Sequence, residues 1–181
     1  MSCLNIPNMI QIGSTGRNSG KTTVAKDIIS TLKDEYKIYG LKIITIKDKG
    51  KCQRGESGCG ICTSIEKGYD LIEEVDLNGQ KDTMEILRAG CEKVFLLKAF
   101  TPHLKDGFLE FLNQIPMEKS VIICESNSIR EIVKPGMFVM MNNTDLKSVK
   151  KSASKVIDKA DLVLNSSTYI KENLKESKEW V

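Results

Sequence analysis

The chain has 181 residues, a length that suits one domain of moderate size. Apolar residues make up 40% and charged residues 28%, which is ordinary for a globular protein and argues against general disorder. The net charge of +3 is small and Lys and Arg are spread along the chain, so a nucleic-acid-binding surface is not indicated. The chain has six cysteines and a single histidine, His103. This composition disfavours a histidine-rich zinc site and a Ser-His-Asp hydrolase.

No stretch approaches the roughly 20 apolar residues that a membrane span needs. The N-terminal segment has neither the basic region nor the long apolar region of a signal peptide. We therefore expect a cytoplasmic protein without membrane contact. In such a reducing compartment, clustered cysteines bind metals or act in catalysis more often than they form disulfides.

Short apolar runs typical of strands alternate with segments of helical periodicity. Strands are expected at residues 9–12, 38–46, 94–97, 121–125, 137–141 and 162–164. Helices are expected at residues 21–36, 81–89, 104–112 and 146–160, with a closing helix in the tail from residue 169 to 181. Apolar strands separated by helices imply a parallel sheet covered on both faces. We therefore expect one α/β domain over residues 1–181, a three-layer sandwich with a mostly parallel sheet and a cysteine-rich insertion at 47–64.

The segment Gly13–Thr23 (GSTGRNSGKTT) follows the first expected strand and opens the first expected helix, the context that a P-loop requires. Gly20 lets backbone N–H groups turn toward phosphate, Lys21 reaches the β- and γ-phosphates, and the Thr22 hydroxyl coordinates Mg²⁺. The segment predicts a P-loop nucleoside triphosphatase fold. The predicted phosphate-binding residues are Gly16, Arg17, Asn18, Ser19, Gly20, Lys21, Thr22 and Thr23.

The first half of this segment departs from the usual motif. Thr15 stands where the first glycine is expected, and Gly13 and Gly16 flank it. A related class of metal-insertion ATPases has an additional lysine at the position of Gly16, so that signature is absent. Arg17, one residue later, can still face phosphate.

Three acids are candidates for Mg²⁺ binding or for orienting a water molecule, because ligands bind at the carboxyl ends of parallel strands. Glu125 ends an apolar strand and Asp48 follows another. The alternatives are a helix N-terminal acid for Glu125 and a solvated loop charge for Asp48. Asp82 is a weaker candidate, since it can simply be the first acid of a helix.

Asn142 and Asp145 follow a strand in the pattern by which many GTPases bind guanine, with Asn143 in place of the usual lysine. The alternative is a polar turn that caps the next helix.

Cys52, Cys59 and Cys62 share the glycine-rich segment 47–64. A Cys-x-x-Cys pair can clasp one metal, so we expect Zn²⁺ or an iron–sulfur cluster here; a redox pair and unligated thiols are the alternatives. No fourth ligand is evident, since Cys91 and Cys124 lie in or beside apolar strands and suit a core. A second copy of the chain could supply it, in a homodimer.

Taken together, the chain resembles the molybdopterin-guanine dinucleotide biosynthesis protein B family. The resemblance covers residues 9–165. It is carried by NSGKTT (18–23), by KDT followed by RAGCEKVFLL (81–97) and by VIICES (121–126). It implies a GTP-binding α/β fold, often dimeric, that assists nucleotide attachment to molybdopterin. It also implies GTP or ATP with Mg²⁺ at Lys21, Thr22 and Glu125, and it adds weight to Asp82. The cysteines replace histidines common in that family after the second strand, which indicates a divergent branch.

The leading hypothesis is Mg²⁺-dependent binding and hydrolysis of GTP or ATP, in the maturation of a cofactor or metal cluster with a protein partner. One alternative is a small-molecule kinase, in which the γ-phosphate goes to a metabolite. Another is a non-catalytic, nucleotide-dependent adaptor or metal carrier.

Overall fold

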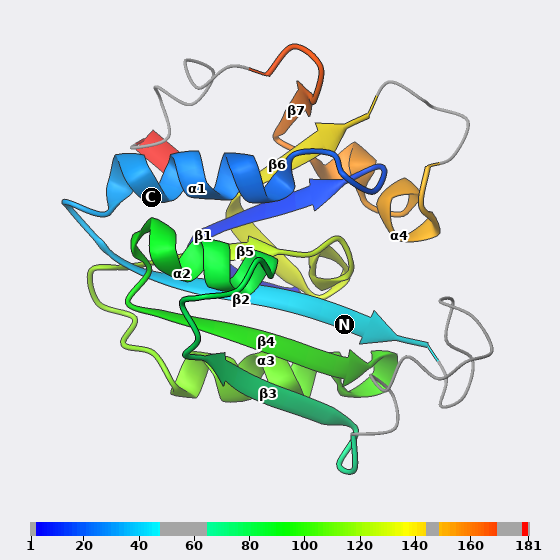
Figure 1. Cartoon of the computed structure of the whole chain (residues 1–181). Helices are drawn as coiled ribbons and strands as arrows, with labels where there is room; N and C mark the ends of the chain where they lie inside the picture. The colour runs from blue at the N-terminus through cyan, green and yellow to red at the C-terminus, as the bar shows by residue number, and fades with distance from the viewer. Residues whose placement is uncertain (1–2, 48–64, 144–148, 170–178, 181) are drawn as a thin grey trace.

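A computed structural model of the chain describes residues 3–47, 65–143, 149–169 and 179–180 (Figure 1). The strands are β1 (Leu4–Ser14), β2 (Lys37–Ile46), β3 (Tyr69–Glu74), β4 (Lys93–Phe100), β5 (Ser120–Glu125), β6 (Val133–Asn142) and β7 (Leu162–Asn165). The helices are α1 (Lys21–Leu32), α2 (Asp82–Gly90), α3 (Leu104–Asn113) and the short α4 (Lys151–Ser154). Single 3₁₀ turns lie at Thr101–His103, Ser128–Glu131 and Ile157–Lys159.

The strands of this part of the chain form one sheet in the order β3-β4-β2-β5-β1-β6-β7. Every neighbouring pair is parallel except β3 and β4, which are antiparallel. The expected α/β class with a mostly parallel sheet is therefore confirmed. β1 lies between β5 and β6, so the segment that follows β1 leaves the sheet near its centre.

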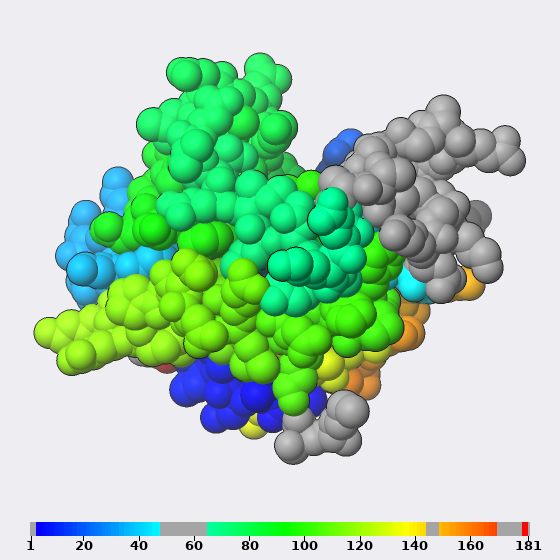
Figure 2. Space-filling view, turned by 90° about the horizontal axis from the view of Figure 1, so that it is seen from below, coloured from blue at the N-terminus to red at the C-terminus, as the bar shows by residue number. Residues whose placement is uncertain are grey.

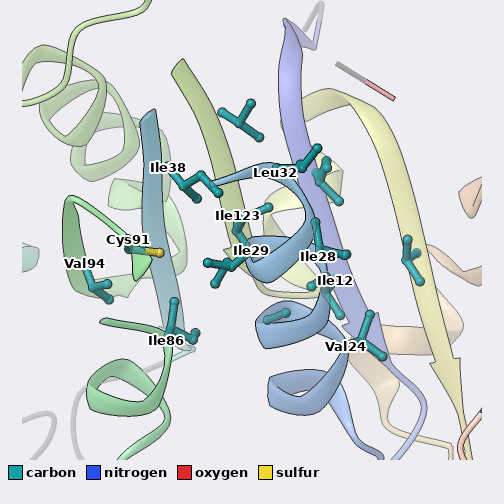
Figure 3. Close-up of a cluster of buried hydrophobic side chains, with 14 of the residues drawn as sticks. Ile12, Val24, Ile28, Ile29, Leu32, Ile38, Ile86, Cys91, Val94 and Ile123 are labelled. Atoms are coloured by element: carbon teal, nitrogen blue, oxygen red, sulfur yellow. The ribbon is translucent and has the colours of Figure 1, made fainter. Parts of the chain in front are cut away.

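The two faces of the sheet are covered by different helices (Figure 1). One buried cluster joins α1 and α2 to the sheet through Val24, Ile28 and Ile86 (Figure 3). The other joins α3 to the opposite face through Leu104 and Phe108. Neighbouring strand residues alternate between the two clusters because successive side chains of a strand point to opposite faces. Figure 2 looks toward the β3 edge of the sheet, with the region of α2 on one side of β3 and that of α3 on the other.

Helix α1 forms where the apolar spacing predicted a helix. Its buried side chains recur every three or four residues, as on one face of a helix: Val24, Ala25, Ile28, Ile29 and Leu32. The predicted strands are present, and the predicted helices at 81–89 and 104–112 correspond to α2 and α3.

Strand β3 was not expected from the sequence. Its residues YDLIEE are only partly buried, because it is one of the two edge strands of the described sheet and pairs with β4 alone. The sequence pattern therefore lacks the continuous apolar run that identified the inner strands. Acidic side chains such as Glu73 suit an exposed edge, where charge opposes pairing with other chains.

The predicted continuous helix at 146–160 is wrong over its described part. Only Lys151–Ser154 is α-helical, and a 3₁₀ turn follows at Ile157–Lys159. The connection is tied down at both ends, since the Lys150 N–H donates to the Thr15 carbonyl at 3.0 Å and Asp161 pairs with the backbone of Phe138. The expected tail helix lies mostly outside the described residues. No helix in the described ranges has the length and apolarity to cross a membrane.

Candidate functional site

The loop of residues 15–20 joins the end of β1 to the start of α1 and is called here the β1–α1 loop. Two of its residues adopt left-handed backbone conformations, Asn18 with a φ of 50° and Gly20 with a φ of 80°. Gly20 is the N-cap of α1, makes no side-chain cap, and no acid follows in the first turn. Within the described residues no side chain caps the first N–H groups of this twelve-residue helix, and the helix itself has no acid in its first turn. Such a helix start is suited to an anion.

Thr15, at the unusual first position of the loop, is 2% exposed and ties the loop to the end of β6. Its N–H donates to the Met141 carbonyl at 3.0 Å. Its hydroxyl donates to Asn142 Oδ1 at 3.2 Å and accepts from the Asn143 N–H at 2.9 Å. A glycine could not make these side-chain bonds, so threonine fixes the position of the loop.

Asn127, just after β5, holds the root of the same loop. Its Oδ1 accepts from the Ser14 N–H at 2.8 Å and its Nδ2 donates to the Ser14 carbonyl at 2.9 Å. The side-chain amide therefore acts as the next strand would, and extends the backbone pairing at the end of β1.

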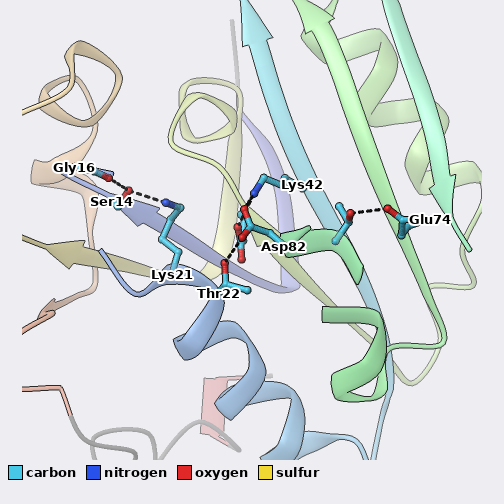
Figure 4. A network of polar contacts seen from close by, with 9 residues as sticks. Ser14, Gly16, Lys21, Thr22, Lys42, Glu74 and Asp82 are labelled. Atoms are coloured by element: carbon cyan, nitrogen blue, oxygen red, sulfur yellow. Dashed lines mark hydrogen bonds and ion pairs between the residues drawn. The ribbon is translucent and has the colours of Figure 1, made fainter. Parts of the chain in front are cut away.

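Two lysines attach to the first half of the β1–α1 loop. The Lys21 ammonium donates to Ser14 Oγ at 3.0 Å, and that hydroxyl donates to the Gly16 carbonyl at 2.9 Å (Figure 4). Lys150 Nζ donates to the same carbonyl at 2.7 Å. Burial lowers the pKa of Lys21, and Glu125 offsets part of that effect. The pKa of Lys150 falls to about 8, first through burial and then through Lys21, Arg17 and Lys42.

Two carboxylates and a third lysine meet beside the start of α1 (Figure 4). The Thr22 hydroxyl donates to Asp82 Oδ1 at 3.1 Å, and the Lys42 ammonium pairs with the other oxygen of Asp82. Lys42 Nζ also lies 3.6 Å from Glu125 Oε2. Asp82 begins α2, so it can complement that helix dipole and contact Thr22 at once.

Glu125 is 2% exposed and lies between the strands that carry Ile12 and Lys42. Neither of its carboxylate oxygens accepts a hydrogen bond from any residue that the structure describes. A buried carboxylate of this kind is costly unless a cation or a donor comes to it. It is therefore the group in this site most in need of a further partner.

The structure brings together several residues singled out in the sequence. Thr22, Asp82 and Glu125 converge beside the β1–α1 loop, where Arg17 and Asn18 are exposed, Ser19 is buried, and Thr23 is exposed on α1. The side chain of Asn142 accepts a hydrogen bond from Thr15 in the β1–α1 loop, and the guanine-binding role given to Asn142 stays a prediction. The roles given to Asp48, Asp145, Cys52, Cys59 and Cys62 fall outside the described residues and stay predictions. Cys91 and Cys124 are buried, as expected of core residues.

Sequence reasoning missed Lys42 and Lys150. Lys42 carried a signal, because it is a single charge inside the apolar run IYGLKIITI, and such a residue in an inner strand needs a partner. Lys150 carried none, since it stands in a lysine-rich stretch and reaches its partner across 134 positions of the chain.

Comparisons of the chain with protein-family models, with curated proteins and with solved structures found no match. The resemblance to the molybdopterin-guanine dinucleotide biosynthesis protein B family therefore stays an expectation from sequence motifs.

Proposed function

We propose that the chain binds a nucleoside triphosphate with Mg²⁺ at the β1–α1 loop and hydrolyses it. One observation carries this proposal. The start of α1, the ammonium groups of Lys21 and Lys150, and the Thr22–Asp82–Glu125 group all lie around one loop. The first two features favour phosphate, and the third offers oxygen atoms of the kind that Mg²⁺ prefers.

The cationic side is suited to phosphate oxygens. Lys21 donates to Ser14, an uncharged acceptor, and we propose that it exchanges this bond for a charge-assisted bond to phosphate. Backbone N–H groups at Gly20 and the first turn of α1 would add donors that cost little to reorganise, because the helix already holds them.

The donor set of Thr22, Asp82 and Glu125 fits Mg²⁺. The ion is usually held by one or two carboxylates, by phosphate oxygens and by water, so it does not need a closed cage of side chains. Thr22 and Asp82 are already in contact, and the unbonded oxygens of buried Glu125 face the shared Lys42. When bound, Mg²⁺ would neutralise charge on the outer phosphates. In the proposed reaction Glu125 would accept a hydrogen bond from the attacking water.

The nucleotide test uses variants of two lysines on the same helix. Lys21→Ala should weaken the binding of ATP and GTP about ten- to hundredfold, the usual effect of losing a bond to a charged group. Lys26→Ala is the matched control, since Lys26 pairs with Glu85 on α2 at 2.7 Å and has no part in the site. Isothermal titration with each nucleotide measures both. Equal affinities in the wild type and Lys21→Ala would reject the proposal.

Hydrolysis is distinguished from group transfer by following the γ-phosphate. Incubation with γ-³²P-labelled nucleotide in a metabolite extract should release inorganic phosphate, and Glu125→Gln should slow that release at least tenfold. Label on a small metabolite would identify a kinase instead. Tight binding with neither outcome would identify a nucleotide-dependent adaptor or metal carrier.

The proposal extends to a role in maturing a cofactor or metal cluster with a protein partner. It rests on the family resemblance and on Cys52, Cys59 and Cys62, which would hold Zn²⁺ or an iron–sulfur cluster, within one chain or across a homodimer. Elemental and sulfide analysis of anaerobically purified protein tests it, with Cys59→Ser as the comparison. Absence of zinc, iron and sulfide from the wild type would reject this extension and leave the nucleotide proposal intact.

A further inference from the structure

Both the backbone and the side chain of Lys150 bond to the β1–α1 loop. Its backbone N–H donates to the Thr15 carbonyl at 3.0 Å, and its Nζ donates to the next carbonyl, that of Gly16, at 2.7 Å. The ammonium therefore has a fixed place over the first half of the loop. Because the side chain is only partly buried, it also remains within reach of a ligand.

A chain of hydrogen bonds connects this ammonium to that of Lys21. Lys150 Nζ and Ser14 Oγ both donate to the Gly16 carbonyl, and Lys21 Nζ donates to Ser14 Oγ. Both ammonium groups are thus held at the same short stretch, residues 14–16.

Among the described residues, the charges that act on the pKa of Lys150 are cationic. They are Lys21 on α1, Arg17 in the loop and Lys42 on β2, and each lowers its pKa further after burial has done so. The Gly16 carbonyl supplies Lys150 with only a partial negative charge, whereas Lys42 is also paired with the carboxylates of Asp82 and Glu125. A multiply charged anion at Lys150 would offset the repulsion from its cationic neighbours.

We propose that Lys150 binds the outermost phosphate of the nucleotide, and that it makes the site prefer triphosphates to diphosphates. This inference rests on the proposed function. The outermost phosphate is assigned because a P-loop lysine spans the two outer phosphates, and Lys150 is connected to Lys21 through the Gly16 carbonyl and the Ser14 hydroxyl. A diphosphate would leave Lys150 with the Gly16 carbonyl alone.

The test compares the affinities of ATP and ADP for three variants, by isothermal titration at pH 7 with Mg²⁺. Lys150→Met keeps the apolar stem and removes the charge. It should weaken ATP about ten- to hundredfold and leave ADP within about twofold. Lys150→Arg should retain the preference for ATP. Lys151→Met, which removes an exposed neighbouring charge, should match the wild type.

A pH series separates a phosphate ligand from a residue that merely braces the loop. In the free protein the Lys150 ammonium loses its proton as the pH rises above about 8. A bound phosphate would keep Lys150 protonated, so binding at higher pH requires the uptake of a proton. The affinity of the wild type for ATP should therefore fall by up to about tenfold for each pH unit from 8 to 9.5. In Lys150→Arg the charge persists, so the slope should flatten. Thermal unfolding of each variant reports whether it is folded.

The outcomes are distinct. If the wild type binds neither nucleotide, or if Lys21→Ala has no effect, the proposed function fails and this inference with it. If those two results are as expected but Lys150→Met keeps the wild-type ratio of ATP to ADP affinity, only the assignment of Lys150 fails. That assignment also fails if the pH slopes of the wild type and Lys150→Arg coincide.

Discussion

The ion pair between Lys42 and Glu125 offers the sharpest test of whether the buried charge of Glu125 depends on a neighbouring cation. Glu125 is buried, its oxygens accept no hydrogen bond from the described residues, and Lys42 Nζ lies 3.6 Å away. Lys42→Met removes the charge and keeps a side chain of similar length. We expect this variant to unfold more easily, because it leaves Glu125 charged, buried and without its cation.

The size of the effect follows from the geometry. Unit charges 3.6 Å apart interact by about 5 kcal/mol at an effective dielectric constant of about 20. Water reduces this value, since the Lys42 side chain is 24% exposed and is also shared with half-exposed Asp82. Removing one partner of a buried pair usually costs about 3–5 kcal/mol. We therefore expect Lys42→Met to lower the free energy of unfolding by about 3 kcal/mol.

The assay is urea unfolding at pH 7 without Mg²⁺ or nucleotide, followed by far-ultraviolet circular dichroism. Glu125→Gln alone should cost about 1 kcal/mol, and the double variant should cost little more than Glu125→Gln, which gives a coupling of about 2–3 kcal/mol. Lys93→Met is the control, because its pair with Glu73 on the β4–β3 edge is nearly half exposed and should matter by less than about 1 kcal/mol. If Lys42→Met changes stability as little as Lys93→Met, and the two site substitutions add independently, Glu125 does not depend on Lys42 and the reasoning is refuted.

Four further predictions concern the frame of the site and the buried thiols. Gly136→Ala should lower the free energy of unfolding in urea by about 1–3 kcal/mol, because the added Cβ would lie 1.9 Å from a backbone carbonyl oxygen of β1. If the variant is as stable as the wild type, β1 and β6 can move apart at this point without cost. Asn127→Ala should lower the free energy of unfolding by about 1–3 kcal/mol and should also weaken ATP binding, because it removes both hydrogen bonds to the backbone of Ser14. Unchanged ATP affinity in a titration would show that the position of Ser14 does not affect the binding site. Burial raises the pKa of Cys91 to about 12 and that of Cys124 further, so iodoacetamide at pH 8 should label neither until urea unfolds the chain, as mass spectrometry can show. For the same reason stability should decline as the pH rises above about 9, where thiols ionise in the unfolded chain but not in the folded one, and a flat profile from pH 8 to 11 would contradict this.

Much of the fold could be predicted from local patterns in the sequence. Inner strands such as β5 are buried on both faces and therefore appear as continuous apolar runs. Helix α1 shows its buried face at helical spacing for the same reason. The two predictions that failed, those for β3 and for the segment 146–160, concern parts of the chain that are only partly buried. Strand β3 has one neighbour and half-exposed side chains, and the 146–160 segment is bent by contacts at Lys150 and Asp161 with distant residues.

The residues of the site also differ in how far the sequence predicts them. Lys21 and Thr22 belong to a contiguous motif whose spacing carries its meaning, and Asp82 and Glu125 stand at element ends where ligands are expected. The contacts of Lys150 depend on the connection after β6 returning to the β1–α1 loop, which no local pattern encodes. The threonine in place of the first glycine was an anomaly in the sequence. The structure gives it a reason, since its hydroxyl bridges the loop to the end of β6.

The distribution of charge in the site indicates what kind of ligand would complete it. Lys42 is engaged with two carboxylates, and those carboxylates have oxygen atoms to offer a cation. Lys21 and Lys150 instead donate to an uncharged hydroxyl and an uncharged carbonyl, in a region where burial already opposes their charge. A lone anion would satisfy the lysines and leave Glu125 unbonded, while a lone cation would do the reverse. A phosphate chain carrying Mg²⁺ presents both charges a few ångströms apart, which is the pairing that this arrangement of side chains favours.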